Sequence, residues 1–134
     1  TNPDPNLIED GTYFVVEAED VLVGCGGWSR RKKLFTGSED QEALSGRYLD
    51  PLIDAAKIRA FFVAPECVRR GIGRILYSEC EVQASTRGFK AFELMATLPG
   101  VPFYERLGFR NVEPENILLP NGEVLPCIKM RREI

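Results

Sequence analysis

The chain has 134 residues and a formal net charge of −3, with 44% hydrophobic and 28% charged residues. This length suits one domain, residues 1–134, and the acidic balance argues against a general nucleic-acid binder. No apolar run approaches the ~18 residues that a membrane span needs, so we expect no membrane contact.

Histidine is absent, and the four cysteines form no C-x-x-C pair. We therefore expect reduced thiols in a cytoplasmic protein and no metal site. The absence of histidine also excludes catalysis by Ser-His-Asp or Cys-His groups. Any catalysis would have to use carboxylates, tyrosine, cysteine, backbone groups or water.

The first part of the chain predicts a linker followed by a β-hairpin. Residues 1–11 are rich in Pro, Asn and Asp, which is typical of a loop. The β-branched and aromatic runs 12–17 and 21–28, separated by residues 18–20, predict two antiparallel strands. Three glycines weaken the second strand and indicate a bulge or a close approach of another group.

A long polar segment, residues 29–56, follows without sustained periodicity and predicts a loop excursion. Its basic block, residues 30–33, could contact a phosphate, but a solvated charge run explains it more simply. Residues 57–64 then predict a strand, which Pro65 ends.

Apolar residues between Arg70 and Arg87 recur at helical spacing and predict a helix. The expected stripe consists of Ile72, Ile75, Leu76, Cys80 and Ala84. Gly88 is the expected stop just beyond the helix. Because a second strand-like run, 91–98, comes next, we expect a right-handed crossover between two parallel strands.

The C-terminal third predicts a short helix and a second hairpin. Pro102 can open a helix that runs through Leu107, with Gly108 ending it. Residues 117–119 and 124–130 flank a Pro-Asn-Gly sequence, and the Asn-Gly pair is typical of a hairpin turn.

The segment CVRRGIGR, residues 67–74, joins the predicted strand to the helix and has the features of an anion-binding loop. A helix N-terminus carries unpaired N–H groups and a partial positive charge, and Gly71 and Gly73 remove side chains that would block a ligand. Neither the P-loop nor the dinucleotide-binding pattern fits these residues. An ordinary connection with exposed arginines is the alternative interpretation.

Two motifs together resemble the GNAT acyl-CoA N-acyltransferase superfamily. The first runs from Val63 through Pro65 to RRGIGR at 69–74, and the second is FYERLGF at 103–109. The resemblance implies an α/β (α+β) fold whose twisted, mostly antiparallel sheet contains a parallel strand-helix-strand crossover with flanking helices. It extends from Thr12 onward and implies that the family's first strand and two following helices are missing before Thr1. Bare edge strands would then favour a homodimer.

The resemblance also implies the ligands. The protein would transfer an acetyl or short acyl group from acetyl-CoA to an amine, with the amine left open. Loop amides would hold the coenzyme A pyrophosphate, and the preceding strand would pair with the pantetheine arm. The implied residues are Phe62, Val63, Val68, Arg69, Arg70, Gly71, Ile72, Gly73 and Arg74. At the position of Val68 the family usually has Gln or Arg.

Tyr104 stands where family members place a tyrosine beside the coenzyme sulfur, which implies a hydrogen bond to the leaving thiolate. Glu93 is the first candidate for a general base because it lies in the crossover strand. An ion-paired strand residue is the competing interpretation, and Asp50 and Asp54 are weaker candidates. Two other functions stay open: a non-catalytic acyl-CoA-binding module of the same fold, and a different phosphate or nucleotide binder.

Overall fold

The computed structural model describes residues 10–31, 48–64 and 71–134. Its main strands are β1 (Tyr13–Ala18), β2 (Val21–Ser29), β3 (Ala56–Val63), β4 (Ala91–Thr97), β5 (Arg110–Pro114) and β8 (Cys127–Glu133). The other elements are the helix α3 (Ile72–Thr86), the 3-10 turn η2 (Leu98–Gly100), the short helix α4 (Val101–Arg106) and the strands β6 (Ile117–Leu118) and β7 (Val124–Leu125).

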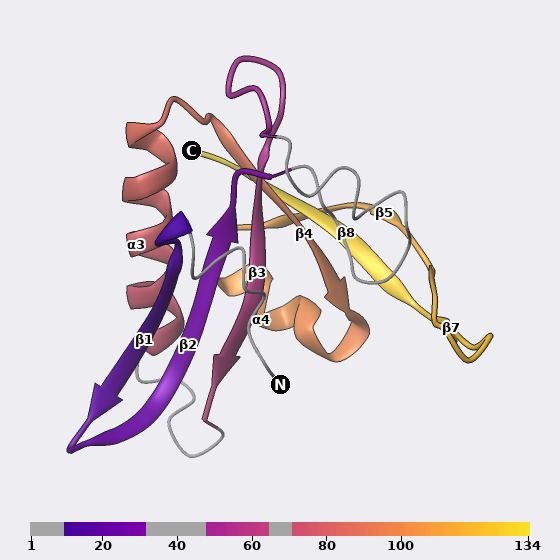
Figure 1. Cartoon of the computed structure of the whole chain (residues 1–134). Helices are drawn as coiled ribbons and strands as arrows, with labels where there is room; N and C mark the ends of the chain where they lie inside the picture. Colours follow the sequence, from indigo (N-terminus) through magenta and orange to yellow (C-terminus); the bar gives the residue numbers. More distant parts are fainter. Residues whose placement is uncertain (1–9, 32–47, 65–70) are drawn as a thin grey trace.

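The six main strands form one sheet in the order β1-β2-β3-β4-β8-β5, and β6 and β7 form a separate two-stranded sheet. Within the main sheet β3 and β4 are parallel, whereas the other neighbouring pairs are antiparallel. Parallel neighbours need a crossover, which α3 provides as it passes along the sheet (Figure 1). The fold is therefore mixed α+β with a mostly antiparallel sheet, as the resemblance to the GNAT superfamily implies.

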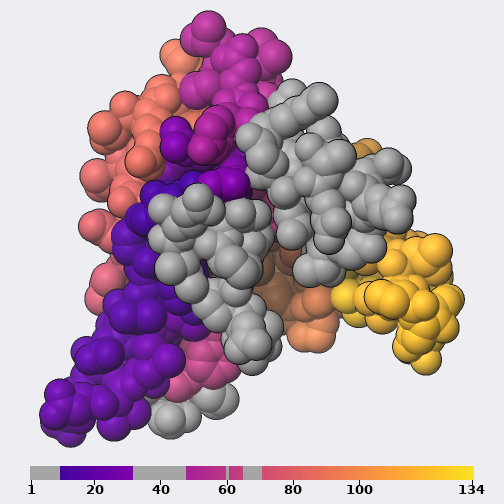
Figure 2. Space-filling model, viewed as in Figure 1, coloured from indigo at the N-terminus to yellow at the C-terminus, as the bar shows by residue number. Residues whose placement is uncertain are grey.

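The predicted N-terminal hairpin is confirmed, with β1 and β2 joined through Glu19 and Asp20. These two residues have φ values of 53° and 64°, the left-handed backbone of a tight hairpin turn. The expected irregularity in β2 is also present, because its register with β3 shifts between Cys25 and Gly27. In the space-filling view the tip of this hairpin and the β6–β7 segment project at opposite sides of the molecule (Figure 2).

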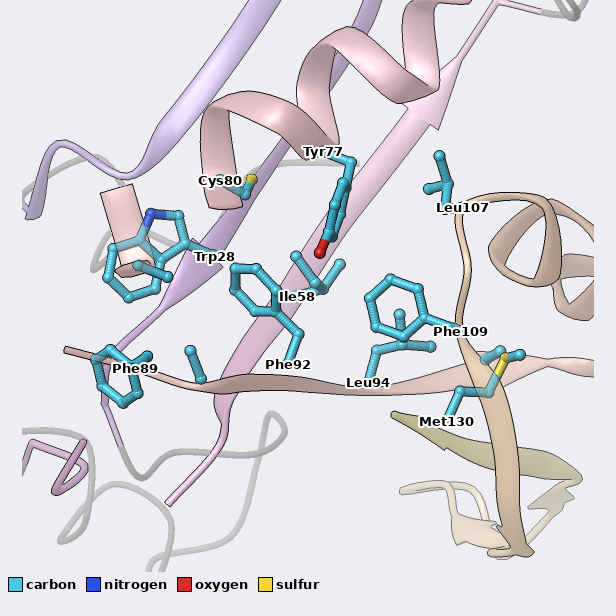
Figure 3. Close-up of a cluster of buried hydrophobic side chains, with 13 residues drawn as sticks. Trp28, Ile58, Tyr77, Cys80, Phe89, Phe92, Leu94, Leu107, Phe109 and Met130 are labelled. Atoms are coloured by element: carbon cyan, nitrogen blue, oxygen red, sulfur yellow. The ribbon is translucent and has the colours of Figure 1, made fainter. Parts of the chain in front are cut away.

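Aromatic side chains fill the core between α3 and the sheet (Figure 3). Trp28 and Phe92 have no exposed surface, and their ring centroids lie 6.4 Å apart. The buried indole N–H of Trp28 donates to Oε1 of Gln83 on α3 at 2.8 Å, so its polar atom keeps a partner. This cluster fixes α3 against β2 and β4.

The predicted stripe on α3 is correct in four of its five members and wrong in one. Ile75 is 57% exposed, whereas Tyr77 is 4% exposed. Tyr77 turns toward Phe92 and Phe109, with ring centroids at 5.7 and 5.8 Å. The buried face of the helix is therefore rotated toward β4 and the segment before β5. The expected stop is confirmed, because Gly88 has a φ of 89°.

The predicted C-terminal hairpin is present as β6 and β7, but its second strand is shorter than predicted. The run expected as one strand, 124–130, is divided by Pro126, which has no N–H to donate. Before it, β7 pairs with β6, and after it β8 pairs with both β4 and β5. The edge strand β5 was not predicted, because all its residues are exposed and its sequence has no apolar alternation.

Residues 32–47 of the predicted loop excursion lie outside the described residues, and an isolated bridge joins Arg31 to Tyr48 on either side of them. Arg31 also forms an ion pair with Asp10 at 2.6 Å. Helices long and apolar enough to cross a membrane are absent from the described part of the chain.

Candidate functional site

The parallel strands β3 and β4 pair at one end and diverge toward the other (Figure 1). Only Ala56 with Phe92 and Lys57 with Glu93 are in register, although the strands continue to Val63 and Thr97. Beyond these two pairs, the facing edges of β3 and β4 have no strand partner among the described residues. An edge of this kind can accept an extended ligand through its backbone N–H and C=O groups. We call the two regions the closed end and the open end of the β3–β4 pair.

The N-terminus of α3 lies at the open end, because the chain passes from the end of β3 into this helix. Gly71 is the N-cap residue, with a φ of 79°, and no side chain of the described residues caps the first turn. A Cβ atom at Gly71 would meet none of the described residues within 4 Å. The first helical hydrogen bond runs from the Ile75 N–H to the Gly71 carbonyl, which leaves the amides of 72–74 without an acceptor inside the helix. Such amides attract phosphate oxygens.

Gly73 has a different role from the one that its spacing suggests. It is buried, and a Cβ atom there would lie 2.7 Å from Cζ of Phe103. The missing side chain thus admits α4 rather than a ligand. The Gly73 amide still belongs to the uncapped first turn. A glycine that accommodates a ligand and one that accommodates a helix look alike in a sequence.

Tyr104 on α4 lies in an aromatic group beside the open end. Its ring centroid is 5.1 Å from that of Phe103, 6.0 Å from Phe109 and 6.5 Å from Phe61. The contact with Phe61 places Tyr104 against the C-terminal half of β3. Burial raises the pKa of Tyr104 to about 12, so the hydroxyl keeps its proton at neutral pH. This hydroxyl forms no hydrogen bond with any of the described residues.

Glu93 lies at the closed end and is surrounded by cations. Its carboxylate is 3.0 Å from Nζ of Lys57, 3.0 Å from Nη1 of Arg131 and 3.8 Å from Nζ of Lys129. Burial disfavours the ionised form, but the hydrogen bonds from Lys57 and Arg131 outweigh it, and the pKa of Glu93 lies below its ordinary value. A carboxylate held in this way accepts a proton poorly.

The two weaker candidates for a base are engaged in a turn. The Asp54 carboxylate accepts a hydrogen bond from the Asp50 N–H at 2.8 Å, and the Asp50 carboxylate accepts one from the Leu52 N–H at 3.0 Å. Both side chains therefore stabilise the chain just before β3.

The other residues predicted from the sequence lie either near the open end or outside the described residues. Phe62 is 52% exposed and Val63 is half-buried, and both pair with β2 at the open end. Arg74 donates to the Arg106 carbonyl at 3.0 Å. The positions of Val68, Arg69 and Arg70 lie outside the described residues. The structure thus brings Phe62, Val63, the turn 71–74 and Tyr104 to one end of the sheet and leaves Glu93 at the other.

Phe61 and Phe103 are contributors that the sequence did not indicate. They pack against Tyr104 from β3 and α4. Phe103 belongs to the FYERLGF motif, which could have pointed to it, whereas Phe61 differs from its neighbour Phe62 only by strand alternation.

Several solved N-acetyltransferases share this fold. Naa20 from Chaetomium thermophilum, in complex with a bisubstrate analogue, is 21% identical with a TM-score of 0.70, over 97% of this chain and 70% of that one. A GCN5-related N-acetyltransferase from Rhodopseudomonas palustris is 19% identical with a TM-score of 0.65, over 96% and 65% of the two chains. An aminoglycoside 6'-N-acetyltransferase complexed with coenzyme A is 18% identical with a TM-score of 0.61, over 90% and 71%. The chain thus spans 65–71% of the length of these three proteins.

The structural similarities show the fold alone, whereas a match to the sequence model of a protein family shows family membership. The model of the acetyltransferase (GNAT) domain matches residues 9–111. The chain therefore belongs to the GNAT acetyltransferase family, as its two motifs predict. A search of curated proteins found no match.

Proposed function

We propose that the protein is an N-acetyltransferase that moves an acetyl group from acetyl-CoA directly to an amine. The observation that carries this proposal is the divergence of β3 and β4 beside the uncapped N-terminus of α3 and the side chain of Tyr104. Family membership supports the same reaction class.

The open end suits a coenzyme A thioester in two respects. The unpartnered edge of β3, which includes Phe62 and Val63, can pair with the amides of an extended pantetheine arm. The N–H groups of Ile72, Gly73 and Arg74 can hold the pyrophosphate without any side chain. The bound thioester supplies the activated acetyl group and a thiol leaving group. In this proposal Val68, Arg69 and Arg70 complete the phosphate site.

Tyr104 is the proposed hydrogen-bond donor to the leaving sulfur. With a pKa of about 12, the phenol is a weak acid. Full proton transfer to a thiolate of pKa about 8.5 would therefore cost about 5 kcal/mol. A hydrogen bond avoids this cost and still stabilises the charge that develops on sulfur. The contacts with Phe61 and Phe103 hold the ring in place for this role.

The acceptor amine must lose protons during the reaction. Deprotonation of an amine of pKa about 10.4 at pH 7 costs about 4.6 kcal/mol. A base or a chain of waters is therefore required. Glu93 stays the carboxylate that the sequence predicts for this step, but its three cationic neighbours disfavour it. We therefore assign the proton transfer to water and give Glu93 the role of holding the closed end of the site.

The experiment is a calorimetric titration of the protein with acetyl-CoA, and in parallel with NAD and ATP. We expect saturable binding of acetyl-CoA alone. Release of free thiol would then be measured with aminoglycosides, polyamines, amino acids, arylamines and peptides with a free N-terminus. Binding with turnover on one amine class would establish the proposal, and binding without turnover on any of them would contradict catalysis. The absence of acetyl-CoA binding would contradict the donor site itself.

A further inference from the structure

The side chain of Phe61 comes from an irregular part of β3. Between two regular pairs of β2 and β3, the single residue Gly26 faces residues 60 and 61 of β3. Such a β-bulge bends the strand and changes the direction in which a side chain points. The bulge lies in the part of β3 that has already diverged from β4. It therefore sets the direction of the Phe61 side chain beside the open end.

Gly26 provides the space that the Phe61 ring occupies. This glycine is buried, and a Cβ atom there would lie 2.8 Å from both Cγ and Cε1 of Phe61. Non-bonded carbon atoms prefer separations of about 3.5–4.0 Å, so a side chain at position 26 would displace the ring. The ring thus packs directly on the backbone of β2. Its removal would leave a space that Gly26 has no side chain to fill.

The Phe61 ring also contacts Tyr104, with ring centroids 6.5 Å apart and an angle of 52° between the planes. Phe61 is half-buried, whereas Trp28 and Phe92 in the core have no exposed surface. It packs against both buried clusters, the one that contains Trp28 and the one that contains Leu76. The ring therefore lies at the boundary between the packed core and the open end of the β3–β4 pair.

The proposed function places the coenzyme sulfur at the Tyr104 hydroxyl and the pantetheine arm along the edge of β3. The acyl carbon is bonded to this sulfur, so the acyl chain begins among the side chains around Tyr104. Of these, Phe103 packs on α3 at Gly73, and Phe109 is 4% exposed. Phe61 lies on the strand that would hold the arm, and it is the aromatic side chain that a growing acyl chain would meet.

We propose that the ring of Phe61 limits the length of the acyl group and restricts the donor to acetyl-CoA or a CoA ester of similarly short chain. The proposal rests on the proposed function. A longer chain would have to enter the space that the ring fills, and close-packed groups yield only with strain. One extra methylene group in an apolar site changes recognition by about 10–200-fold. Phe61 is thus a specificity residue, and Gly26 makes room for it.

The test compares the affinities of acetyl-CoA and hexanoyl-CoA by calorimetry. Both ligands share the coenzyme A part, so the ratio of their affinities reports the acyl chain alone. For the unchanged protein we expect acetyl-CoA to bind at least about tenfold more tightly. In Phe61→Ala the two affinities should lie within about twofold of each other, or hexanoyl-CoA should bind more tightly. Phe61→Leu should give an intermediate ratio, and it provides the test if Phe61→Ala does not fold.

Phe89→Leu is the matched control for loss of packing. Phe89 is 3% exposed, and its ring centroid lies 5.8 Å from that of Trp28. We expect this variant to lower Tm at least as much as Phe61→Leu but to keep the full ratio of affinities. Binding is measured rather than turnover, because a displacement of Tyr104 in the Phe61 variants would lower kcat for every donor.

The outcomes separate this proposal from the proposed function. Equal affinity of the unchanged protein for the two CoA esters would overturn the role of Phe61 and leave the donor site intact. The same conclusion would follow if both Phe61 variants kept the ratio of the unchanged protein, since the ring would then have only a structural role. Failure of acetyl-CoA and of coenzyme A itself to bind would overturn the proposed function together with this inference.

Discussion

The two ends of the β3–β4 pair differ in strand pairing, in side-chain packing and in how fully their polar groups are paired. At the closed end the strands are in register, Trp28 and Phe92 pack without exposed surface, and Glu93 is paired with cations on both neighbouring strands. At the open end, the strand edges, the first turn of α3 and the Tyr104 hydroxyl all have donors without a partner among the described residues.

This difference shows how one strand pair can provide stability at one end and a binding site at the other. Packing and ion pairs at the closed end provide the free energy that keeps the strands together. The open end can then leave polar groups unpaired, because exposed donors cost little while water satisfies them and become useful when a ligand replaces the water. Substitutions at the closed end should therefore reduce stability, and those at the open end should reduce binding or turnover.

The largest effect should come from Trp28→Ala at the closed end. Loss of this buried side chain should lower the free energy of unfolding by about 3–5 kcal/mol, measured by urea denaturation. Val82→Ala, at a 62% exposed position of α3, is the control and should change it by less than about 0.5 kcal/mol. A loss below about 1 kcal/mol for Trp28→Ala would show that the closed end is not the main source of stability.

Tyr104→Phe should produce the next effect, at the open end. We expect kcat to fall about 100-fold, as for the loss of one donor to a developing charge, with the affinity for acetyl-CoA retained. Tyr77→Phe is the matched control, because Tyr77 is also buried but its hydroxyl bonds to Glu81 at 3.1 Å. Equal turnover for Tyr104→Phe and the unchanged protein would remove Tyr104 from the reaction.

Gly73→Ala should have a smaller effect, and it should lower both the stability of the protein and its turnover. The new methyl group would press on the ring of Phe103 and displace α4, lowering the free energy of unfolding by about 1–3 kcal/mol. Because Tyr104 moves with α4, kcat should fall as well. Gly71→Ala is a useful comparison with Gly73→Ala. Its loss of stability would arise from the backbone φ of 79° at Gly71 rather than from a steric contact with the described residues. If Gly73→Ala changed neither unfolding nor kcat, the packing of α3 on α4 would not position Tyr104.

Glu93→Gln should have the smallest effect, about 1–2 kcal/mol on unfolding at pH 7, because three cations lose their shared partner. The pKa of Glu93 is lowered in the folded protein, so its stabilisation is present above its unfolded pKa of about 4.3 and disappears as the pH falls through the folded value. The variant should therefore lose less stability than the unchanged protein on acidification below about pH 4.3.

Kinetics of Glu93→Gln test the division of roles between the two ends. We expect kcat within about threefold of the unchanged protein, since Glu93 is assigned to structure rather than proton transfer. Glu105→Gln, at an exposed position of α4, serves as the control for loss of one negative charge. A fall in kcat of about 100-fold at unchanged affinity would instead identify Glu93 as the general base.

Local sequence signals predicted most of the fold. The β1–β2 hairpin, the helix with its stop at Gly88, and the parallel crossover all follow from periodicity and from glycine or turn residues within one or two elements. The exposed edge strand β5 carries no such signal, and the register of β8 depends on which strand it meets after Pro126. Ile75 was wrongly assigned to the buried face of α3. The contacts of Tyr77 with Phe92 and Phe109 decide which face of this helix packs against the sheet.

The candidate site was predictable only where it is contiguous. Residues 71–74 and Tyr104 lie in motifs that are read along the chain, whereas the cations around Glu93 come from β3 and β8 and meet only through strand register. Gly73 shows the converse problem, because its motif gives its position but not the group that it accommodates.

The most direct test of the difference between the two ends is amide hydrogen exchange, followed residue by residue by NMR with and without saturating acetyl-CoA. The account predicts that acetyl-CoA slows exchange in residues 59–63 of β3 and in the first turn of α3, 72–74, and leaves the paired residues Ala56 and Lys57 unchanged. Protection that is equal at both ends, or that is confined to elements away from the open end, would contradict the claim that the divergence of β3 and β4 forms the acyl-donor site.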